Sequence, residues 1–353
     1  MDGTRIMKTI RLVAIFGLVG LFLSGCAPKR PVLNIYIWAD YLNPEIVMSF
    51  ERAYGCSVNV EIFDSNETMY AKVKEGKTHY DIVVPSSYLA GLMAQNNMLH
   101  PLDKELLPNV TRNFDVSFWK VILDTNMTYS VPYAFSFSGL AYRKDKVGDR
   151  VVDSWSCLGD PAFAGRVSLL DDPREIIGAA LKLLGYSLNT TDPEELQKAK
   201  EVVLRWKKNN PWIDNELYKT RIASGELSLA HGYNCDILQV MVHDEENIAF
   251  VYPKEGFAVA CDEMIIPVGA KEVGLAHAFI NFFYVPENAC RNIQHICAPM
   301  PNRPGLALLS DRYRSSPALL PFAGIIANSE VIKNLGDANA LYFAIWDEII
   351  AAE

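Results

Sequence analysis

Two hydrophobic patterns alternate along the chain, one typical of buried strands and the other of amphipathic helices. Short apolar runs rich in β-branched and aromatic residues predict strands, whereas apolar residues recurring every three or four positions predict helices. We predict strands over residues 32–38, 57–63, 80–85, 166–170, 227–232, 248–252 and 263–266. We predict helices over residues 44–54, 67–74, 90–96, 173–184, 193–208, 273–283, 286–295 and 338–352.

The first predicted helix has recognisable signals at both ends. Asn43 is suited to cap its first turn, and Pro44 suits the first helical position. Gly55 is suited to end the helix because glycine readily takes the left-handed backbone conformation found at helix C-termini. We therefore expect this helix to begin at Pro44 and to stop before Gly55.

The alternation of strands and helices indicates parallel sheets with helices on both faces. Ligands of such sheets bind in the loops at the carboxyl ends of the strands. The loops after the first and third predicted strands are therefore candidate walls of a binding site, and they hold Trp38, Tyr41, Ser86 and Tyr88. The chain is also too long for one compact core, which favours two lobes.

The N-terminal segment has the features of a bacterial lipoprotein signal peptide. Three basic residues precede an apolar run over 12–23, which is too short to span a bilayer as a helix of roughly 20 residues. The run ends in Leu-Ser-Gly-Cys, a lipobox whose Cys26 would carry the lipid. We predict a signal peptide over 1–25 and a lipidated Cys26 with a tether over 26–31; an ordinary export signal with a chance cysteine is the alternative.

Charge and composition narrow the range of partners. The whole chain has 33 basic and 42 acidic residues, and removal of three basic residues and one acidic residue with segment 1–25 leaves 30 against 41. An acidic surface of this kind argues against nucleic acid or anionic lipid as a partner and permits a cationic ligand. We therefore expect an extracytoplasmic protein that is held to a membrane by its lipid anchor and binds no nucleic acid.

Residue types that carry chemistry are scattered. The six cysteines after Cys26 show no CxxC and no disulfide-framework spacing, so we expect mostly free, buried thiols. The six histidines stand alone, and no nucleophile elbow, phosphate-binding loop or metal-ligand spacing occurs. We therefore predict a binding protein that is not an enzyme and has neither a metal nor a cofactor.

Five segments, in order along the chain, carry a resemblance to a known family. They read NIYIWADY (34–41), DSNETMY (64–70), YDIVVPSSY (80–88), DDPRE (171–175) and PKEG (253–256). Together they closely resemble the bacterial spermidine/putrescine-binding proteins, from about Leu33 to Pro304. The resemblance implies a two-lobed α/β periplasmic-binding-protein fold of type II, with a mostly parallel sheet in each lobe and a hinge between them.

The resemblance also implies the domain boundaries and the partners. Lobe 1 would comprise residues 32–135 and 264–304, and lobe 2 residues 136–263 and 305–353. The expected ligand is a polyamine, spermidine or putrescine, and the expected partners are an ABC-transporter permease and its ATPase. We expect the protein itself to be a monomer.

The resemblance assigns a role to nine residues. It puts Trp38, Tyr41, Ser86 and Tyr88 on one wall of the cleft, Asp172 and Glu175 on the second lobe, Tyr233 over the ligand, Asp262 against an ammonium, and Asn215 at a small polar contact. This set suits a polyamine, because ring faces attract ammonium groups and pack on methylenes. A buried ammonium also requires carboxylate partners.

Each of these residues also has a purely structural explanation. Trp38 and Tyr41 could be core aromatics, and Ser86 and Tyr88 could simply shape a turn. Asp172 precedes a helix that begins with a proline and has Glu175 at its third position, which is the pattern of a capping box. One carboxylate oxygen can cap a helix while the other faces a ligand, so this explanation and the binding role are compatible.

Two departures from the family pattern leave the ligand open. Ala260 and Ala298 stand where family members carry aromatic residues, and the family's glutamine near the C-terminus has no counterpart. Losing two ring faces would widen the cleft and remove roughly 1 to 4 kcal/mol of contact. The alternatives are another organic cation or amine in the same fold, or a lipid-anchored sensor that has lost transport.

Overall fold

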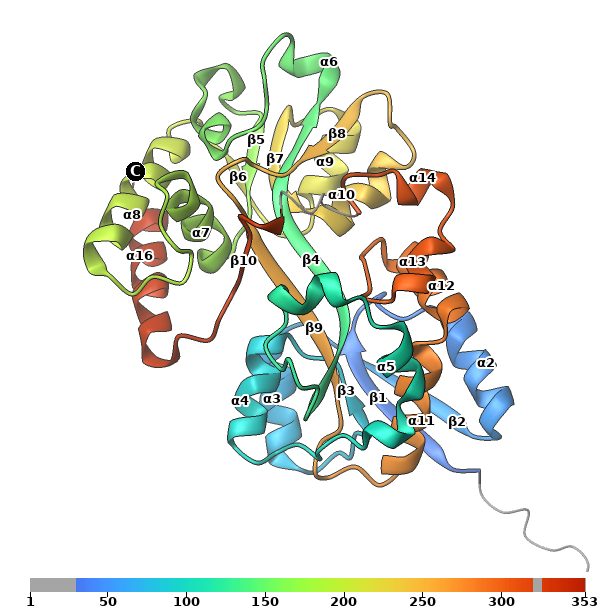
Figure 1. Ribbon diagram of the computed structural model, residues 1–353. Coiled ribbons are helices and arrows are strands. Elements are labelled where there is room, and N and C mark those ends of the chain that lie inside the picture. The colour runs from blue at the N-terminus through green and yellow to red at the C-terminus, as the bar shows by residue number, and fades with distance from the viewer. Residues whose placement is uncertain (1–29, 320–325, 353) are drawn as a thin grey trace, which may run out of the picture.

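The computed structural model describes residues 30–319 and 326–352, which form two lobes joined by long central strands (Figure 1). The predicted signal peptide and Cys26 lie outside the described residues. We call the part built on β1 (Val32–Trp38), β2 (Ser57–Phe63) and β3 (Ile82–Val83) lobe 1. Lobe 2 is the part built on β5 (Val167–Leu169), β6 (Trp212–Ile213), β7 (Leu229–Tyr233) and β8 (Ile248–Val251).

All the strands join in one ten-stranded sheet in the order β2-β1-β3-β9-β4-β7-β5-β6. Two further strands lie off this path, with β8 paired to β4 and β10 (Glu330–Val331) paired to β9 (Ala258–Ile265). The outer pairs β1–β2, β1–β3, β5–β6 and β5–β7 are parallel, as the strand–helix alternation predicts. The pairs that β4 makes with β9, β7 and β8 are antiparallel.

The central strand β4 (Ser130–Arg143) connects the two lobes. Its residues 130–137 pair with β9, and its residues 138–143 pair with β7 and β8. The change of partner falls close to the predicted lobe boundary between 135 and 136. Our pattern analysis did not predict β4, because the strand is buried on both faces and is interrupted by proline, serine and glycine, so its sequence does not alternate.

The helices cover both faces of the sheet (Figure 1). In chain order they are α2 (Pro44–Tyr54), α3 (Asn66–Glu75), α4 (Ser87–Gln95), α5 (Pro108–Asn113), α6 (Lys144–Val147), α7 (Pro173–Leu183), α8 (Pro193–Lys207), α9 (Tyr218–Ser224), α10 (Asn234–Met241), α11 (Val273–Phe283), α12 (Pro286–Ile296), α13 (Arg303–Ala307), α14 (Asp311–Arg314) and α16 (Asn339–Ala351). The sequence did not predict the short helices α9 and α10.

Several local predictions are confirmed residue by residue. Strands β1 and β2 and helix α11 have the predicted bounds. The side chain of Asn43 accepts from the N–H of Glu45, and Gly55 ends α2 with a left-handed backbone at φ 63°. The prediction for α4 was wrong at its start, because the turn expected at Ser86–Tyr88 is already the first turn of the helix.

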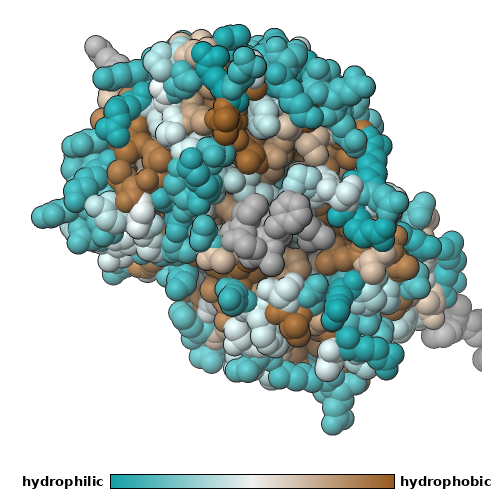
Figure 2. Space-filling view, turned by 45° about the horizontal axis from the view of Figure 1, so that its top comes forward, coloured by the Kyte–Doolittle hydropathy of each residue, from teal (hydrophilic) through white to brown (hydrophobic). Residues whose placement is uncertain are grey.

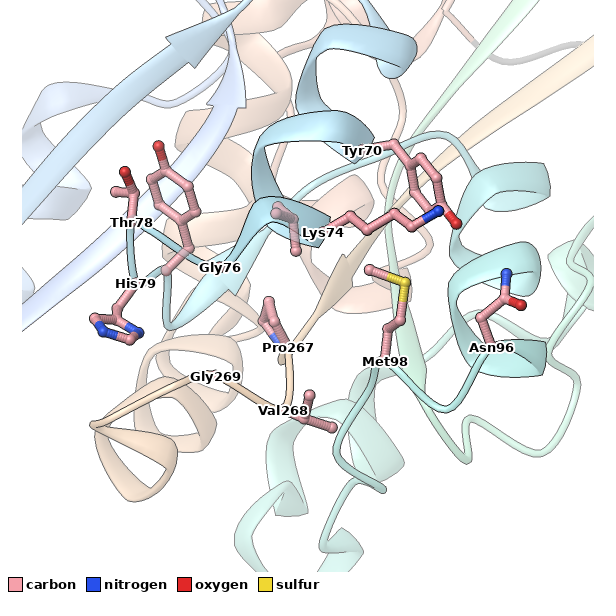
Figure 3. A pocket seen from close by; sticks show the side chains of 12 residues that line it. Tyr70, Lys74, Gly76, Thr78, His79, Asn96, Met98, Pro267, Val268 and Gly269 are labelled. Carbon is pink, nitrogen blue, oxygen red and sulfur yellow. The ribbon is translucent and has the colours of Figure 1, made fainter.

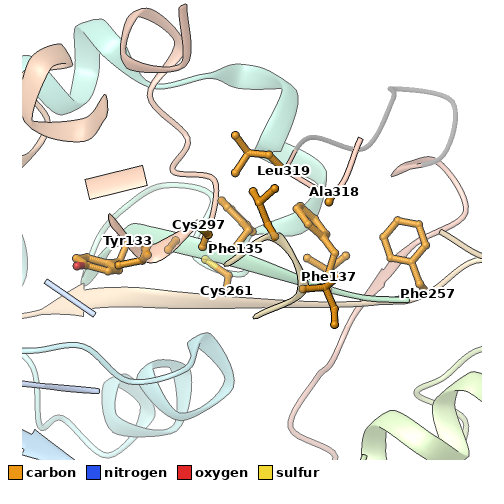
Figure 4. Packing of buried hydrophobic residues seen from close by; sticks show 14 of the residues in the cluster. Tyr133, Phe135, Phe137, Phe257, Cys261, Cys297, Ala318 and Leu319 are labelled. Carbon is orange, nitrogen blue, oxygen red and sulfur yellow. The ribbon is translucent and has the colours of Figure 1, made fainter. Parts of the chain in front are cut away.

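A row of aromatic residues on β4 forms the core where the lobes meet. Tyr133, Phe135 and Phe137 are all fully buried (Figure 4). The ring of Tyr133 stacks on Phe283 of α11 at 4.8 Å, and that of Phe135 stacks on Phe118 at 4.7 Å. This packing anchors the lobe 1 half of β4 between α11 and the segment that carries Phe118.

The chain returns to lobe 2 at its C-terminal end. Helix α16 packs against α7 and α8, and the hydroxyl of Tyr342 donates to the carbonyls of Leu188 and Thr190, each at 2.9 Å. The face of the molecule in Figure 2 is mostly hydrophilic, with separate apolar patches. Within residues 30–319 and 326–352, helices with the length and hydropathy of a membrane span are absent.

The six cysteines after Cys26 are free, as predicted. Four of them are buried and two are partly buried: Cys56, Cys261, Cys290 and Cys297, then Cys157 and Cys235.

Candidate ligand-binding cleft

A cavity of about 680 Å³ lies between the two lobes. Eight of the nine predicted site residues line it: Trp38, Ser86, Tyr88, Asp172, Glu175, Asn215, Tyr233 and Asp262. The structure therefore brings together residues from six separate segments of the sequence. It also adds lining residues to which the sequence assigned no role, among them Asn66, Glu67, Ser136, Lys333, Asn339 and Phe343.

The lobe 1 end of the cleft is built around the carboxylate of Asp262. Strand β9 meets the end of β3, where the N–H of Glu263 donates to the carbonyl of Pro85 at 2.9 Å. This pairing brings Asp262 opposite Ser86, whose hydroxyl donates to Oδ1 of Asp262 at 3.0 Å. The hydroxyl of Tyr41 donates to Oδ2 at 2.8 Å. Both carboxylate oxygens therefore have a donor before any ligand arrives.

Burial dominates the electrostatics at Asp262. Loss of hydration raises the pKa of its carboxyl to about 6, although the hydrogen bonds from Tyr41 and Ser86 oppose the rise. Ser86 is itself held in place, because Asn66 donates to its hydroxyl at 3.1 Å and accepts from its backbone N–H at 3.2 Å. Asn66 belongs to the segment 64–70 that carried the family resemblance, which was the available signal for its role.

Tyr41 differs from its expected position on the wall of the cleft. It is absent from the described residues that line the cavity, and it acts on the cavity through its hydrogen bond to Asp262. Its ring lies 5.2 Å from that of Tyr133, and the hydroxyl of Tyr133 donates to the carbonyl of Tyr41. Tyr41 therefore orients the carboxylate of Asp262 through this hydrogen bond and is not itself one of the described lining residues.

The lobe 2 end of the cleft is built at the first turn of α7. Oδ1 of Asp172 accepts from the N–H groups of Arg174 at 2.8 Å and of Glu175 at 3.2 Å, so the predicted N-cap is confirmed. Because one oxygen serves the cap, the other stays available to a ligand. Burial raises the pKa of Asp172, and its two backbone hydrogen bonds oppose the rise.

Glu175 is the least satisfied carboxylate in the cleft. It is 2% exposed, and its Oε2 has no hydrogen-bond partner in the described part of the chain. Burial, followed by the charge of Asp172, raises its pKa to about 8. The predicted capping box would have Glu175 bond the backbone of Asp172, but no such bond is present among the described residues. An ammonium group would supply the missing partner.

Arg174 is engaged elsewhere and leaves these carboxylates without a close basic partner. Its guanidinium donates to the carbonyl of Lys333 and to the side chains of Asn339 and Asn189, each at 2.9 Å. It also lies over the ring of Tyr342, at 4.5 Å from the ring centre. Arg174 therefore ties the start of α7 to the C-terminal segment.

Aromatic rings line the cleft between the two acidic ends. Trp38, at the end of β1, packs on Phe63 at 4.4 Å between ring centres. Tyr88 lies in the first turn of α4, and burial raises the pKa of its hydroxyl to about 12, so it stays protonated. Tyr233 caps α10, and its N–H donates to the hydroxyl of Tyr218 at 3.0 Å. These rings can pack against methylene groups and face a cation.

The weaker expectations about the cleft have mixed outcomes. Asn215 lines the cavity, but its side-chain amide bonds both backbone groups of Asp171, each at 2.9 Å, so it shapes the loop beside Asp172. Ala260 lines the cavity as expected. Ala298 is fully buried in the core and lies outside the set of described lining residues, so the widening expected at this position stays a prediction.

The chemistry of the cleft is that of a cation receptor. It offers three buried or partly buried carboxylates at two ends, with ring faces between them. No cluster of metal-ligating side chains occurs in residues 30–319 or 326–352. Fold and site together define an α/β solute-binding protein with two lobes.

Comparisons with known proteins agree with this class. The family model for bacterial extracellular solute-binding proteins matches residues 45–321. The spermidine/putrescine-binding periplasmic protein of Salmonella typhimurium is 32% identical over 337 residues, covering 95% of this chain and 96% of its own length. The putrescine/cadaverine-binding protein of Pseudomonas aeruginosa is 31% identical over 347 residues, covering 94% of this chain and 98% of its own.

Solved structures are equally similar. The spermidine/putrescine ABC transporter substrate-binding protein of Streptococcus pneumoniae superposes with a TM-score of 0.84 at 30% identity, covering 91% of this chain and 98% of its own. The TpPotD lipoprotein of Treponema pallidum superposes with a TM-score of 0.82 at 31% identity, covering 90% and 99%. These likenesses confirm the predicted fold.

The chain belongs to the bacterial extracellular solute-binding proteins and, within them, to the family of the spermidine/putrescine-binding periplasmic proteins. The resemblance predicted from the five sequence segments is thus confirmed. Proteins of this family bind solutes outside the cytoplasm and are not enzymes.

Proposed function

We propose that this protein captures a polyamine, spermidine or putrescine, between its two lobes and delivers it to an ABC-transporter permease and ATPase. The observation that carries the proposal is the pair of acidic ends in one cavity, Asp262 on lobe 1 and Asp172 with Glu175 on lobe 2. Two separated anionic ends with rings between them match a flexible apolar chain that carries an ammonium at each end.

Within this proposal each predicted residue has a role. Asp262 pairs with one ammonium, and Ser86 and Tyr41 orient it. Asp172 and Glu175 pair with the other. Trp38, Tyr88 and Tyr233 pack on the methylenes, and Asn215 acts indirectly by fixing the loop beside Asp172.

We further propose that β4 and β9 act as the hinge between the lobes. The boundary on β4 is the predicted one at 135/136, whereas that on β9 falls before Asp262 instead of at the predicted 263/264, because Tyr41 and Ser86 of lobe 1 bind the carboxylate of Asp262. Both strands lie at the junction: β4 pairs with β9 in its first half and with the lobe 2 strands β7 and β8 in its second half. Bending at β4 and β9 would open the cleft without breaking the parallel sheet of either lobe. We also propose that Cys26 carries the lipid anchor, as in the similar lipoprotein of Treponema pallidum.

The test is the identity of the bound amine. Denaturation of protein that was purified without added ligand should release a polyamine, which mass spectrometry then identifies. In a thermal-shift panel of putrescine, cadaverine, spermidine and spermine, that amine should then raise the melting temperature of the protein by mass action. The proposal fails if no amine is released and no amine in the panel shifts the melting temperature.

A second candidate function keeps the fold and changes the ligand to a bulkier organic cation. The observation that favours it is Ala260, which leaves the cleft wall without the ring that family members carry at this position. A quaternary ammonium such as choline or betaine, added to the same thermal-shift panel, tests this candidate. A larger shift with choline than with any polyamine would favour it.

A further inference from the structure

A second cavity, of about 520 Å³, adjoins the binding cleft on the side of α4. The two cavities share Ser87, Tyr88, Lys333 and Asn334 as lining residues. Helix α4, the segment 123–130 before β4, and the C-terminal segment 333–336 form its walls. The proposed function assigns nothing to this cavity.

The cavity contains a buried carboxylate that the polyamine cleft does not use. Glu263 is 2% exposed, lines this cavity, and its Oε1 has no hydrogen-bond partner among the described residues. It follows Asp262 on β9, but neighbouring side chains on a strand point to opposite faces, so only Asp262 reaches the cleft. A buried carboxylate with an unpaired oxygen is unfavourable unless a cation or a proton compensates it.

Other groups in the cavity also suit a cation. Asp124 lines it, with Oδ2 occupied by the N–H groups of Tyr129 at 2.8 Å and of Ser130 at 3.3 Å. Tyr129 adds a ring whose exposed fraction is 37%. Lys333 is the single lysine or arginine among the described lining residues, so ionised Asp124 and Glu263 leave one negative charge uncompensated.

A cavity at the far end of lobe 1 shows the opposite arrangement (Figure 3). It measures about 480 Å³ and lies between the ends of α3 and α4 and the loop after β9. Its described lining includes Lys74 and His79 but neither aspartate nor glutamate. The ammonium of Lys74 already lies 5.6 Å from the centre of the Tyr70 ring. Lys74 would repel a ligand cation there, so this cavity does not suit an amine.

We propose that the Glu263 cavity is a second cation site, which takes an ammonium group of an amine ligand. The proposal rests on the proposed function, because the cavity adjoins the cleft in which that function holds the amine. The ammonium can come from two sources: the far end of a triamine that extends from the cleft past Tyr88, or a separate diamine molecule. In either case Glu263 and Asp124 supply the charge, and Tyr129 and Tyr88 supply ring faces.

The test compares Glu263→Gln with the matched control Glu105→Gln by calorimetry, using putrescine and spermidine at about pH 8, where both amines remain charged. Glu105 is an exposed lobe 1 residue that lines neither cavity, and its replacement removes the same charge. If a triamine arm occupies the site, Glu263→Gln weakens spermidine by about tenfold or more and putrescine by less than about twofold. If a separate diamine occupies it, wild type binds two putrescines per chain and Glu263→Gln binds one.

The proposal is overturned if Glu263→Gln and Glu105→Gln give the same affinities and stoichiometries as wild type for both amines. A second variant, Gly91→Leu, fills the cavity without changing its charge. Gly91 lies on α4, lines the cavity, and a Cβ added there meets nothing within 4 Å, so the fold should tolerate the change. The variant should reproduce the loss seen with Glu263→Gln, and wild-type binding would count against the site.

Asp262→Asn in the same assay separates the two proposals. If it abolishes tight binding while Glu263→Gln changes nothing, the polyamine function stands and the second site falls. If Asp262→Asn leaves binding intact while Glu263→Gln reduces it, the second site stands and the cleft assignment falls.

Discussion

The two ends of the cleft both carry buried carboxyl groups, but these groups differ in their hydrogen bonding and in their pKa. On lobe 1, Asp262 already accepts hydrogen bonds from Tyr41 and Ser86, and its pKa is raised to about 6. On lobe 2, Glu175 has an oxygen without a partner, and its pKa is raised to about 8. Both carboxyls are buried, so the difference comes from the donors beside Asp262 and from the charge of Asp172 beside Glu175.

This difference indicates an order of events during binding. The lobe 1 end is charged at neutral pH and already oriented, so it can receive an ammonium while the lobes are apart. Glu175 at the lobe 2 end is mostly protonated at neutral pH when it is buried without a ligand, so it becomes fully charged only when a cation is enclosed with it. We expect a polyamine to bind lobe 1 first and lobe 2 on closure.

The largest expected effect on affinity comes from Asp262, at the lobe 1 end of the cleft. Asp262→Asn should weaken polyamine binding by about 2 kcal/mol or more, because a buried ammonium loses its charged partner. Calorimetry with putrescine and spermidine measures the loss. Asp115→Asn, at a partly buried position of lobe 1 outside the cleft, is a control of the same chemistry. Unchanged affinity in Asp262→Asn would remove this residue from the binding site.

The next largest effect on affinity comes from Glu175, at the lobe 2 end of the cleft, and depends on pH. An ammonium favours the ionised carboxyl, so affinity should fall by about tenfold or more as the pH drops from about 8 to about 6, through the raised pKa of Glu175. Glu175→Gln should bind more weakly at pH 8 and lose most of this slope. Calorimetry across this range tests it, and a slope that persists in Glu175→Gln would assign the titration to another group.

The same residue makes a prediction for the ligand-free protein. The folded-state pKa of Glu175 lies above its ordinary value of 4.5, so the folded state retains a proton that the unfolded chain has lost. The raised pKa therefore adds to the free energy of unfolding at pH values below about 4.5. This contribution is lost as the pH rises from about 4.5 to about 8. Glu175→Gln should gain at least about 1 kcal/mol relative to wild type between pH 5 and pH 8.5, as measured by denaturant unfolding without ligand.

The smallest expected effect concerns the wall between the two ends. Ala260→Trp restores a ring to the cleft and should change putrescine affinity by about 0.5 to 2 kcal/mol. Tighter binding would indicate that putrescine leaves this space empty, whereas weaker binding would indicate that the native ligand fills it. Ala298→Ser, at a buried position outside the described lining, should leave affinity unchanged in folded protein. No change in Ala260→Trp would contradict the position of Ala260 in the cleft.

Local structure and most residues of the site followed from the amino-acid order alone. The cap at Asp172, the cap at Asn43 and the left-handed Gly55 depend on residues within a few positions, so short-range pattern analysis finds them. The family resemblance likewise selected nine residues, of which eight line one cavity. Fold class and most site residues were therefore predictable.

The hydrogen bonding and burial of these residues depend on contacts between segments that are distant in the sequence. Ser86 and Tyr41 reach Asp262 across 176 and 221 positions of sequence, through the pairing of β9 with β3 and β4. The same pairing turns Glu263 away from the cleft into its own cavity. On lobe 2, the packing around α7 leaves Oε2 of Glu175 without a partner among the described residues. Burial and hydrogen bonding of a carboxylate depend on which distant segments pack around it, and local sequence patterns do not contain that information.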